Sequence, residues 1–321
     1  MKKYMSILLV LLMLVALFPG CAAAEEPTVI RIGSLKGPTT MGMVKLLSDN
    51  EAGLTAVKYE STVVANATEL MPLFLRGELD VLALPVNAGA VLYNKSQAGA
   101  TLLAVNTLGV LYIVEKGGET IKSVADLKGK TIYATGKSTT PEYALSYLLA
   151  ENGLDIATDV TMEWKSEASE VVAQMATLDS AVALLPQPFV TVAQTKVEGL
   201  RVALDMTAEW ANVGSTLITG GLIIRTAFLN EHPEAVKTFL EEYAASTQYV
   251  NENVEEAAAL VEQYIGVAAG VAKKAIPACN IVCMTGEEMK AAAEKYLTVL
   301  FELNPDAVGG AMPEESFYYL P

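Results

Sequence analysis

The chain has 321 residues, 52% of them hydrophobic, and a formal net charge of −15 at neutral pH. This length suffices for two domains, each with its own core. An acidic protein repels phosphate backbones, so we do not expect nucleic acid as a partner.

The N-terminal segment has the order of an export signal. Lys2 and Lys3 precede an apolar run over residues 6–18, and Gly20 stands directly before Cys21. The run is too short to span a bilayer comfortably. The arrangement resembles a bacterial lipoprotein signal, in which a lipid is attached to the cysteine thiol and the chain is cut before it.

We therefore expect residues 1–20 to be a signal peptide and residues 21–27 to be a lipid-anchored linker, with Cys21 as the lipidation site. Phe18 departs from the usual leucine three positions before the cysteine, so cleavage near residues 22–24 by an ordinary signal peptidase stays open. Loss of residues 1–20 removes two lysines and no acid, which changes the charge from −15 to −17. The sequence predicts no second membrane span.

Strands and helices alternate through the first part of the chain. The periodicity predicts strands over 29–33, 55–60, 80–84 and 101–105, and helices over 40–47, 69–77 and 88–95. Alternation of this kind favours parallel βαβ units. The third strand is apolar throughout, which is typical of a strand that is covered on both faces.

A second alternating series begins near residue 111. We expect strands over 131–134, 161–164, 181–185 and 200–204, and helices over 141–151, 169–177 and 187–194. After a β-rich stretch at 216–224 the chain turns helical, over 232–251, 254–265 and 285–302. Thr140 is the expected N-cap of the helix that starts at Pro141. The two halves predict an α/β protein with two similar lobes.

The sequence contains little that suggests catalysis. The single histidine, His232, is expected to be a solvated residue at the start of a surface helix. Cys279 and Cys283 do not have zinc-site spacing, and either a disulfide or two buried thiols fits them. Residues 136–138 resemble the end of a phosphate-binding loop, but Thr131 occupies the position of its required glycine. We expect no enzyme, no metal and no cofactor.

Two polar loops are the candidate binding elements. Residues 34–41 and 134–141 both combine glycine, hydroxyl side chains and a lysine directly before a helix. A helix N-terminus offers unpaired N–H donors and a partial positive charge, so it favours an anionic or carbonyl-rich ligand. One such loop in each lobe would face the other across a cleft near the carboxyl ends of the strands.

Several segments resemble ABC-transporter substrate-binding proteins of the branch that handles aliphatic sulfonates, nitrate, taurine and thiamine pyrimidine precursors. The matching segments are residues 32–39, 69–80, 123–130, 185–189 and 232–234, and the likeness extends over nearly the whole mature chain. The resemblance implies the two-lobed periplasmic-binding-protein-like fold of type II, hinged by two β crossovers near 106–111 and 219–223. Lobe 1 would comprise residues 28–108 and 222–321, and lobe 2 residues 109–221.

The resemblance also implies a function and a site. The protein would be the extracytoplasmic, membrane-anchored binding component of an ABC importer, a monomer that delivers a small molecule to a permease and, through it, to an ATPase. Asn87, Asn106 and Gln187 would orient the ligand by amide hydrogen bonds. The ligand-binding residues implied are Lys36, Gly37, Pro38, Thr39, Thr40, Met41, Pro85, Asn87, Asn106, Gly136, Ser138, Thr139, Thr140, Gln187 and Pro188.

Two alternatives remain beside import. A sensor would present its ligand to a receptor, and a sensor-kinase gene nearby would indicate it. An exported enzyme that forms the thiamine pyrimidine precursor would consume a histidine of its own, which the surface position expected for His232 disfavours. Many relatives have glutamate where Gln187 stands, and a neutral amide cannot pair with a cationic ligand. We therefore expect a small, neutral-to-anionic ligand.

Overall fold

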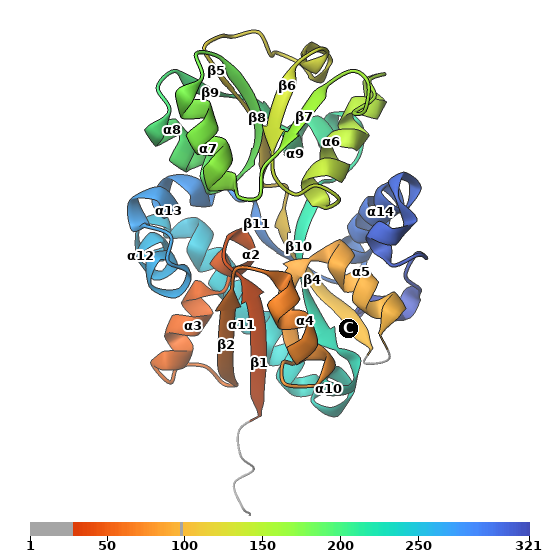
Figure 1. Cartoon of the computed structure of the whole chain (residues 1–321). Coiled ribbons are helices and arrows are strands. Elements are labelled where there is room, and N and C mark those ends of the chain that lie inside the picture. Colours follow the sequence, from red (N-terminus) through yellow and green to blue (C-terminus); the bar gives the residue numbers. More distant parts are fainter. Residues whose placement is uncertain (1–27, 97–98) are drawn as a thin grey trace, which may run out of the picture.

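The computed structural model describes residues 28–96 and 99–321. The expected signal segment, the linker and Cys21 lie outside these ranges. Two mixed β-sheets with helices on their faces form two lobes, with the smaller sheet at the top of Figure 1 and the larger sheet below it. The α/β class expected from the alternating pattern is confirmed.

The larger sheet combines N-terminal strands with strands from the later part of the chain. Its strands are β1 (Val29–Leu35), β2 (Lys58–Val64), β3 (Val81–Pro85), β4 (Ala100–Leu108), β10 (Ile218–Arg225) and β11 (Ile281–Met284). They lie in the order β11-β4-β10-β3-β1-β2. β1 is parallel to β2 and β3, whereas β10 is antiparallel to both β3 and β4.

The smaller sheet repeats this plan. Its strands are β5 (Leu111–Lys116), β6 (Thr131–Ala134), β7 (Thr161–Trp164), β8 (Ala181–Pro186) and β9 (Leu200–Asp205), in the order β7-β6-β8-β5-β9. β6 is parallel to β7 and β8, and β5 is antiparallel to β8 and β9. In each sheet, therefore, three parallel strands are followed by one antiparallel strand that enters from the other lobe.

Helices cover both faces of each sheet. Around the larger sheet lie α2 (Pro38–Met41), α3 (Val44–Glu51), α4 (Ala67–Leu75), α5 (Val86–Lys95), α10 (Thr226–Glu231), α11 (Pro233–Glu252), α12 (Val254–Ile265), α13 (Ala269–Ala275) and α14 (Gly286–Leu303). Around the smaller sheet lie α6 (Thr140–Glu151), α7 (Ala168–Thr177), α8 (Phe189–Lys196) and α9 (Met206–Asn212). The described part of the chain also contains the 3₁₀ turns η1 (Val124–Leu127), η2 (Ile276–Ala278), η3 (Pro305–Val308) and η4 (Glu315–Phe317).

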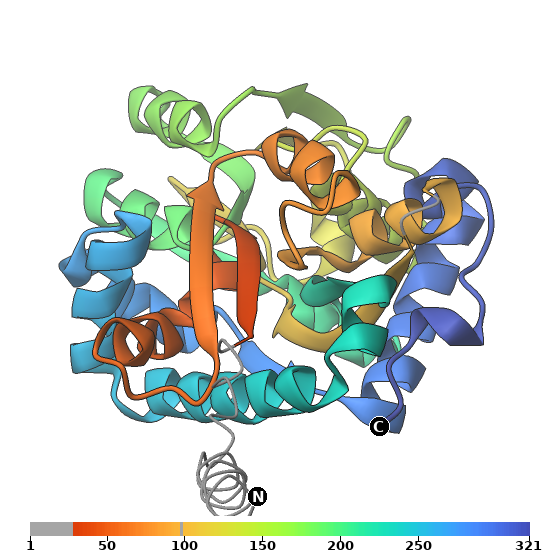
Figure 2. The ribbon, with the colours of Figure 1, turned by 90° about the horizontal axis from the view of Figure 1, so that it is seen from below.

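The core of the larger lobe has two sides. On one face, Ile30 and Ile32 of β1 pack in one cluster with Phe239 of α11. On the other face, Leu82 of β3 packs in a cluster with Phe74 of α4. Figure 2 shows this arrangement from below, with α11 along one side of the sheet and α4 and α5 on the other.

The segment predicted as helix over residues 40–47 is helical except at residues 42–43, where it is divided into α2 and α3, so the prediction of one continuous helix was wrong. The hydroxyl of Ser246 in α11 enters the helical hydrogen-bond ladder at this point. Leu46 N donates to Ser246 Oγ at 3.0 Å, and Ser246 Oγ donates to Gly42 O at 2.7 Å. A side chain inserted in this way breaks a helix, and Ser246 lies 200 residues from Leu46 in sequence. Three short helices, α9, α10 and α13, and strand β11 also escaped prediction because they are too brief for a periodic signal.

The two described cysteines and the histidine are packed against the rest of the protein. Both Cys279 and Cys283 are free thiols, so the disulfide that the sequence left open is not formed. Burial raises the pKa of Cys279 to about 12 and that of Cys283 to about 11, which keeps both protonated at neutral pH. His232 is half-buried rather than solvated, and its ring lies 4.7 Å from that of Phe228 between centroids.

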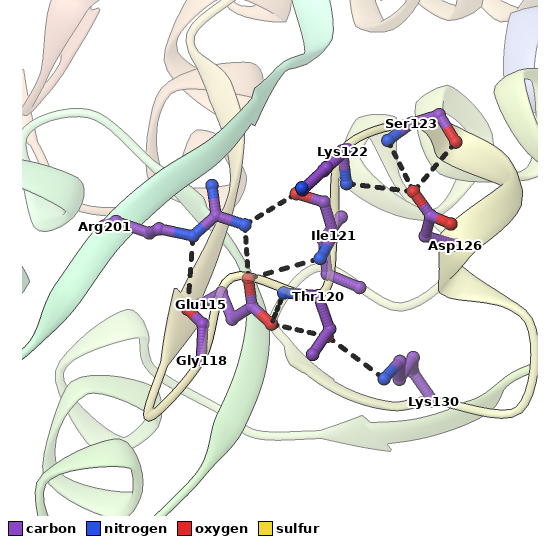
Figure 3. Close-up of polar contacts among 9 residues, drawn as sticks. All are labelled: Glu115, Gly118, Thr120, Ile121, Lys122, Ser123, Asp126, Lys130 and Arg201. Atoms are coloured by element: carbon purple, nitrogen blue, oxygen red, sulfur yellow. Dashed lines mark hydrogen bonds and ion pairs between the residues drawn. The ribbon is translucent and has the colours of Figure 1, made fainter.

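A buried carboxylate secures the loop that follows β5 (Figure 3). Glu115 is 3% exposed and accepts hydrogen bonds from Thr120 N at 2.9 Å, Thr120 Oγ1 at 2.6 Å and Ile121 N at 3.3 Å. Arg201 of β9 forms an ion pair with its other side. Burial alone would raise the pKa of Glu115, but these donors outweigh it, so the pKa lies below the ordinary glutamate value.

Glu115→Gln should lower the free energy of unfolding by about 2 kcal/mol at neutral pH, since it leaves Arg201 without its counter-charge. Because the folded-state pKa is depressed, this stabilisation is present above the unfolded-state pKa and is lost as the pH falls through the folded-state pKa. Urea unfolding at several pH values should therefore show the two proteins converging in acid. Glu119→Gln, an exposed acid of the same loop, is the control and should change stability little. A constant difference at all pH values would contradict this account.

Candidate functional site

A cavity of about 500 Å³ lies between the two lobes. Its wall comes from three parts of the chain: the β1 and β3 ends with α4 and α5, the start of α6 with the loop before it, and the segment after α14. These elements meet on the right-hand side of Figure 1. The residues that line the cavity are Leu35, Ala67, Met71, Pro85, Asn87, Ala88, Val91, Ser138, Thr139, Thr140, Tyr143, Asn304, Asp306 and Ala307.

The sheet topology explains why the cavity forms here. Leu35 is the last residue of β1 and Pro85 the last residue of β3, and these neighbouring strands are parallel. The loop from β6 into α6 occupies the equivalent place in the other lobe. Ligand sites of open α/β sheets lie outside the carboxyl ends of parallel strands, so the position fits a binding cleft.

The loop before α6 is held by its own hydrogen bonds. Gly136 has φ of 81°, and a Cβ there would lie 2.7 Å from Thr139 Oγ1, so only glycine fits without a shift. Thr139 Oγ1 donates to Gly136 O at 2.7 Å, and Ser138 N donates to the Glu142 carboxylate. The helix is capped at Thr139, one residue before the predicted N-cap Thr140.

A hydrogen-bond chain joins the two lobes at the cavity wall. The Tyr143 hydroxyl of α6 donates to Ser138 O at 3.1 Å and accepts from Asn304 Nδ2 at 3.1 Å. Asn304 directly follows α14, which packs on the larger sheet. A single hydroxyl thereby links the loop of the smaller lobe to the C-terminal segment.

Two asparagines of α5 hold the same C-terminal segment. Asn87 Nδ2 donates to Ala307 O at 3.1 Å, and Asn94 Nδ2 donates to Val308 O at 2.7 Å. Asn87 borders the cavity whereas Asn94 lies outside its lining. Asn87 Oδ1 is buried and receives no hydrogen bond from any residue that the structure describes.

Five of the residues predicted to bind ligand line the cavity: Pro85, Asn87, Ser138, Thr139 and Thr140. The remaining ones, which lie outside its lining, are Lys36, Gly37, Pro38, Thr39, Thr40, Met41, Asn106, Gly136, Gln187 and Pro188. Within that second group the Thr39 and Thr40 hydroxyls both donate to Leu35 O, and both side chains are buried.

Asn106 and Gln187 are buried beside the crossover between the sheets. Asn106 Nδ2 donates to Thr39 O at 2.9 Å and to the Tyr243 hydroxyl at 3.1 Å. Gln187 N donates to Val110 O at 2.9 Å, and its side-chain oxygen accepts from Thr191 Oγ1 at 2.9 Å. Both amides therefore have partners within the protein.

Sequence reasoning missed the part of the wall that comes from the end of the chain. Asn304, Asp306 and Ala307 follow the predicted helix 285–302, and the break in helical periodicity there was the available signal. Tyr143 lies at a core-facing position of α6, and nothing in the neighbouring sequence separates it from the other buried residues of that helix. Leu35 and Met71 are apolar residues that no pattern separates from the core.

Comparisons with known proteins agree with this architecture. The sequence profile of the family described as NMT1/THI5 like matches residues 88–257, more than half of the chain. No curated protein matches the chain.

Three solved structures illustrate the likeness. An ABC transporter protein from Parabacteroides distasonis has 24% identity and a TM-score of 0.78, over 91% of this chain and 99% of that one. The periplasmic aliphatic sulphonate binding protein SsuA from Escherichia coli has 17% identity and a TM-score of 0.75, over 92% and 93%. The periplasmic nitrate-binding protein NrtA from Synechocystis has 13% identity and a TM-score of 0.63, over 88% and 84%.

At these identities the likeness shows the fold, which is the two-lobed periplasmic-binding-protein-like fold of type II expected from the sequence. Within residues 28–96 and 99–321, no helix is both long and apolar enough to cross a membrane. The same part of the chain holds no cluster of three or more potential metal-ligating side chains.

Tyr143→Phe should weaken the contact between the lobes, because it removes the hydroxyl that both donates to Ser138 O and accepts from Asn304. We expect a loss of about 1 kcal/mol per hydrogen bond in the free energy of unfolding and a larger radius of gyration by small-angle X-ray scattering. Tyr133→Phe, a half-buried tyrosine of the smaller lobe outside the cavity, is the control. An unchanged scattering profile for Tyr143→Phe would count against a role in holding the lobes together.

Proposed function

We propose that this chain, which belongs to the NMT1/THI5-like family, is the extracytoplasmic substrate-binding component of an ABC importer. The observation that carries the proposal is the cavity between the lobes, whose wall is drawn from both of them. The named structural neighbours, which include sulphonate- and nitrate-binding proteins, support it.

The proposed mechanism follows from a cavity whose wall is formed by two lobes that can move relative to each other. A ligand that touches both lobes binds the closed form more tightly than the open form, and this difference in affinity drives closure. The chain passes between the sheets at residues 109–110 and again between α9 and β10; these passages would serve as the hinges. The closed form would then deliver its ligand to the permease.

The proposed lobes are residues 28–108 with 222–321, and residues 109–221. Sheet membership supports the first boundary, since β4 ends at Leu108 and β5 begins at Leu111. β10 begins at Ile218 and pairs with β3 and β4, which favours a second boundary just before that residue.

The proposed ligand is a small organic molecule or oxyanion of the sulfonate, nitrate or thiamine-precursor type. Pro85, Asn87, Ser138, Thr139 and Thr140 would contact it directly. The remaining predicted residues would support the wall from behind, as the contacts of Asn106 with Thr39 illustrate.

We propose binding without catalysis, by a monomer. The described lining of the cavity contains no histidine, cysteine or lysine that would act as a nucleophile or base. His232 packs against Phe228 and lies outside that lining.

A thermal-shift screen of alkanesulfonates, taurine, nitrate and pyrimidines should identify a compound that raises the melting temperature. Asn87→Ala should then weaken its binding by about tenfold, because Asn87 borders the cavity. Asn94→Ala is the matched control, since it frees the same C-terminal segment from outside the cavity, and it should bind normally. A screen without any stabilising compound, or equal losses in both variants, would contradict the cavity as the binding site.

Cys21→Ala should release the protein from the membrane fraction, because we propose that a lipid on this thiol anchors it beside the permease. Fractionation and metabolic labelling with a fatty-acid analogue test this. A substitution of Cys279 by Ala should leave anchoring intact, and retention of the Cys21 variant in the membrane would exclude the anchor.

A further inference from the structure

We infer that the cleft selects an uncharged small molecule that carries an N–H or O–H donor, and disfavours oxyanions. The inference deepens the proposed binding function and rests on it. Three independent features of the wall point to this class of ligand: its charge, the state of the α6 N-terminus, and an unpaired acceptor.

The first feature is the charge of the wall. None of the described residues that line the cavity is lysine, arginine or histidine. The one charged side chain is the Asp306 carboxylate, which is 85% exposed and lies 3.9 Å from the Lys95 ammonium, a group outside the lining. Lys36 and Lys137, the lysines of the two polar loops, are exposed and lie outside the lining. A desolvated anion needs a counter-charge or several donors, and this wall offers no cation.

The second feature is the N-terminus of α6, which the sequence analysis predicted to favour an anionic ligand. Ser138 N already donates to the carboxylate of Glu142, in the first turn of α6. Thr139 N donates to Gly136 O at 3.1 Å. The Glu142 carboxylate therefore already occupies this N-terminus and offsets the positive end of the α6 dipole. Glu142 lies outside the lining of the cavity, but its carboxylate occupies the Ser138 N–H donor that a ligand oxyanion at this helix end would need.

The third feature is an acceptor, Asn87 Oδ1, that receives no hydrogen bond from the described part of the chain. Asn87 Nδ2 is fixed on Ala307 O, so the amide orientation is set and Oδ1 is the free atom. A buried oxygen without a hydrogen bond is unfavourable, and a donor group of a ligand in the adjacent cavity would satisfy it once the lobes part enough to admit the ligand. The surrounding wall, with Leu35, Met71 and Val91, suits an apolar body.

Matched neutral and anionic compounds test the inference directly. We would measure the affinity of wild-type protein by calorimetry for pairs such as nicotinamide and nicotinate, hexanesulfonamide and hexanesulfonate, and a hydroxymethylpyrimidine and its carboxylate. In each pair that shows binding, the neutral member should bind at least about tenfold more tightly, because the wall offers an anion no cationic side chain to offset its desolvation, and the carboxylate of Asp306 repels it.

Variants of α6 separate the charge of Glu142 from the rest of the wall. Glu142→Gln keeps an oxygen for Ser138 N but removes the charge, so it should shift the neutral-to-anion affinity ratio by about fivefold or more toward the anion. Glu151→Gln makes the same change at the far end of α6, on an exposed residue, and should leave the ratio within about twofold.

The outcomes distinguish this inference from the function on which it rests. Anions that bind wild type as tightly as their amides, or an unchanged ratio in Glu142→Gln, overturn the charge inference and leave the binding function intact. If no member of any pair binds, and the wider thermal-shift screen also finds no ligand, both the inference and the proposed function fail.

Discussion

The double passage of the chain between the sheets is the constraint on which the rest of the structure depends. Each passage delivers one antiparallel strand, β5 to the smaller sheet and β10 to the larger one, beside the third parallel strand of that sheet. Because the same arrangement occurs in both lobes, the carboxyl ends of both sets of parallel strands face the boundary between the lobes. A cavity at that boundary then follows from topology, before any side chain is specified.

The segment after α14 adds a further wall to the site at this boundary. Asn304 lies between the end of α14 and the 3₁₀ turn η3, and its side chain reaches the Tyr143 hydroxyl of the other lobe. Asn87 and Asn94 hold the following carbonyls on α5. The cavity therefore depends on residues separated by more than 200 positions in sequence. This segment couples the position of α14, which belongs to the larger lobe, to the loop that opens α6.

Periodicity in the sequence sufficed for the class of fold and for most of the strands, and β3, which is buried on both faces, has an unbroken apolar signal. The strand predicted over 161–164 coincides with β7, and the apolar run before Pro85 is β3. The polar loop before α6 identified Ser138, whereas Pro85 and Asn87 were implied by the family resemblance. Hydrogen bonds between residues remote in sequence could not be predicted. Nothing in the sequence around residues 42–46 indicates the contact with Ser246, and nothing around Tyr143 indicates the contact with Asn304. These contacts depend on how the folded helices and strands pack together.

The start of α6 shows why a helix N-terminus is weak evidence for an anion site. The same Glu142 that strengthens the helix signal also competes for the donors that such a site would need. The Glu142 carboxylate is part of the same chain and so is present at high effective concentration, and an anionic ligand would have to displace it. The N-terminus of α6 is occupied and the wall of the cavity is largely apolar. The free energy for closure around a ligand would therefore come mainly from burial of apolar surface, about 25 cal/mol per Å². Ligand affinity in such a cleft would vary little with salt, because no ion pair between ligand and wall is screened.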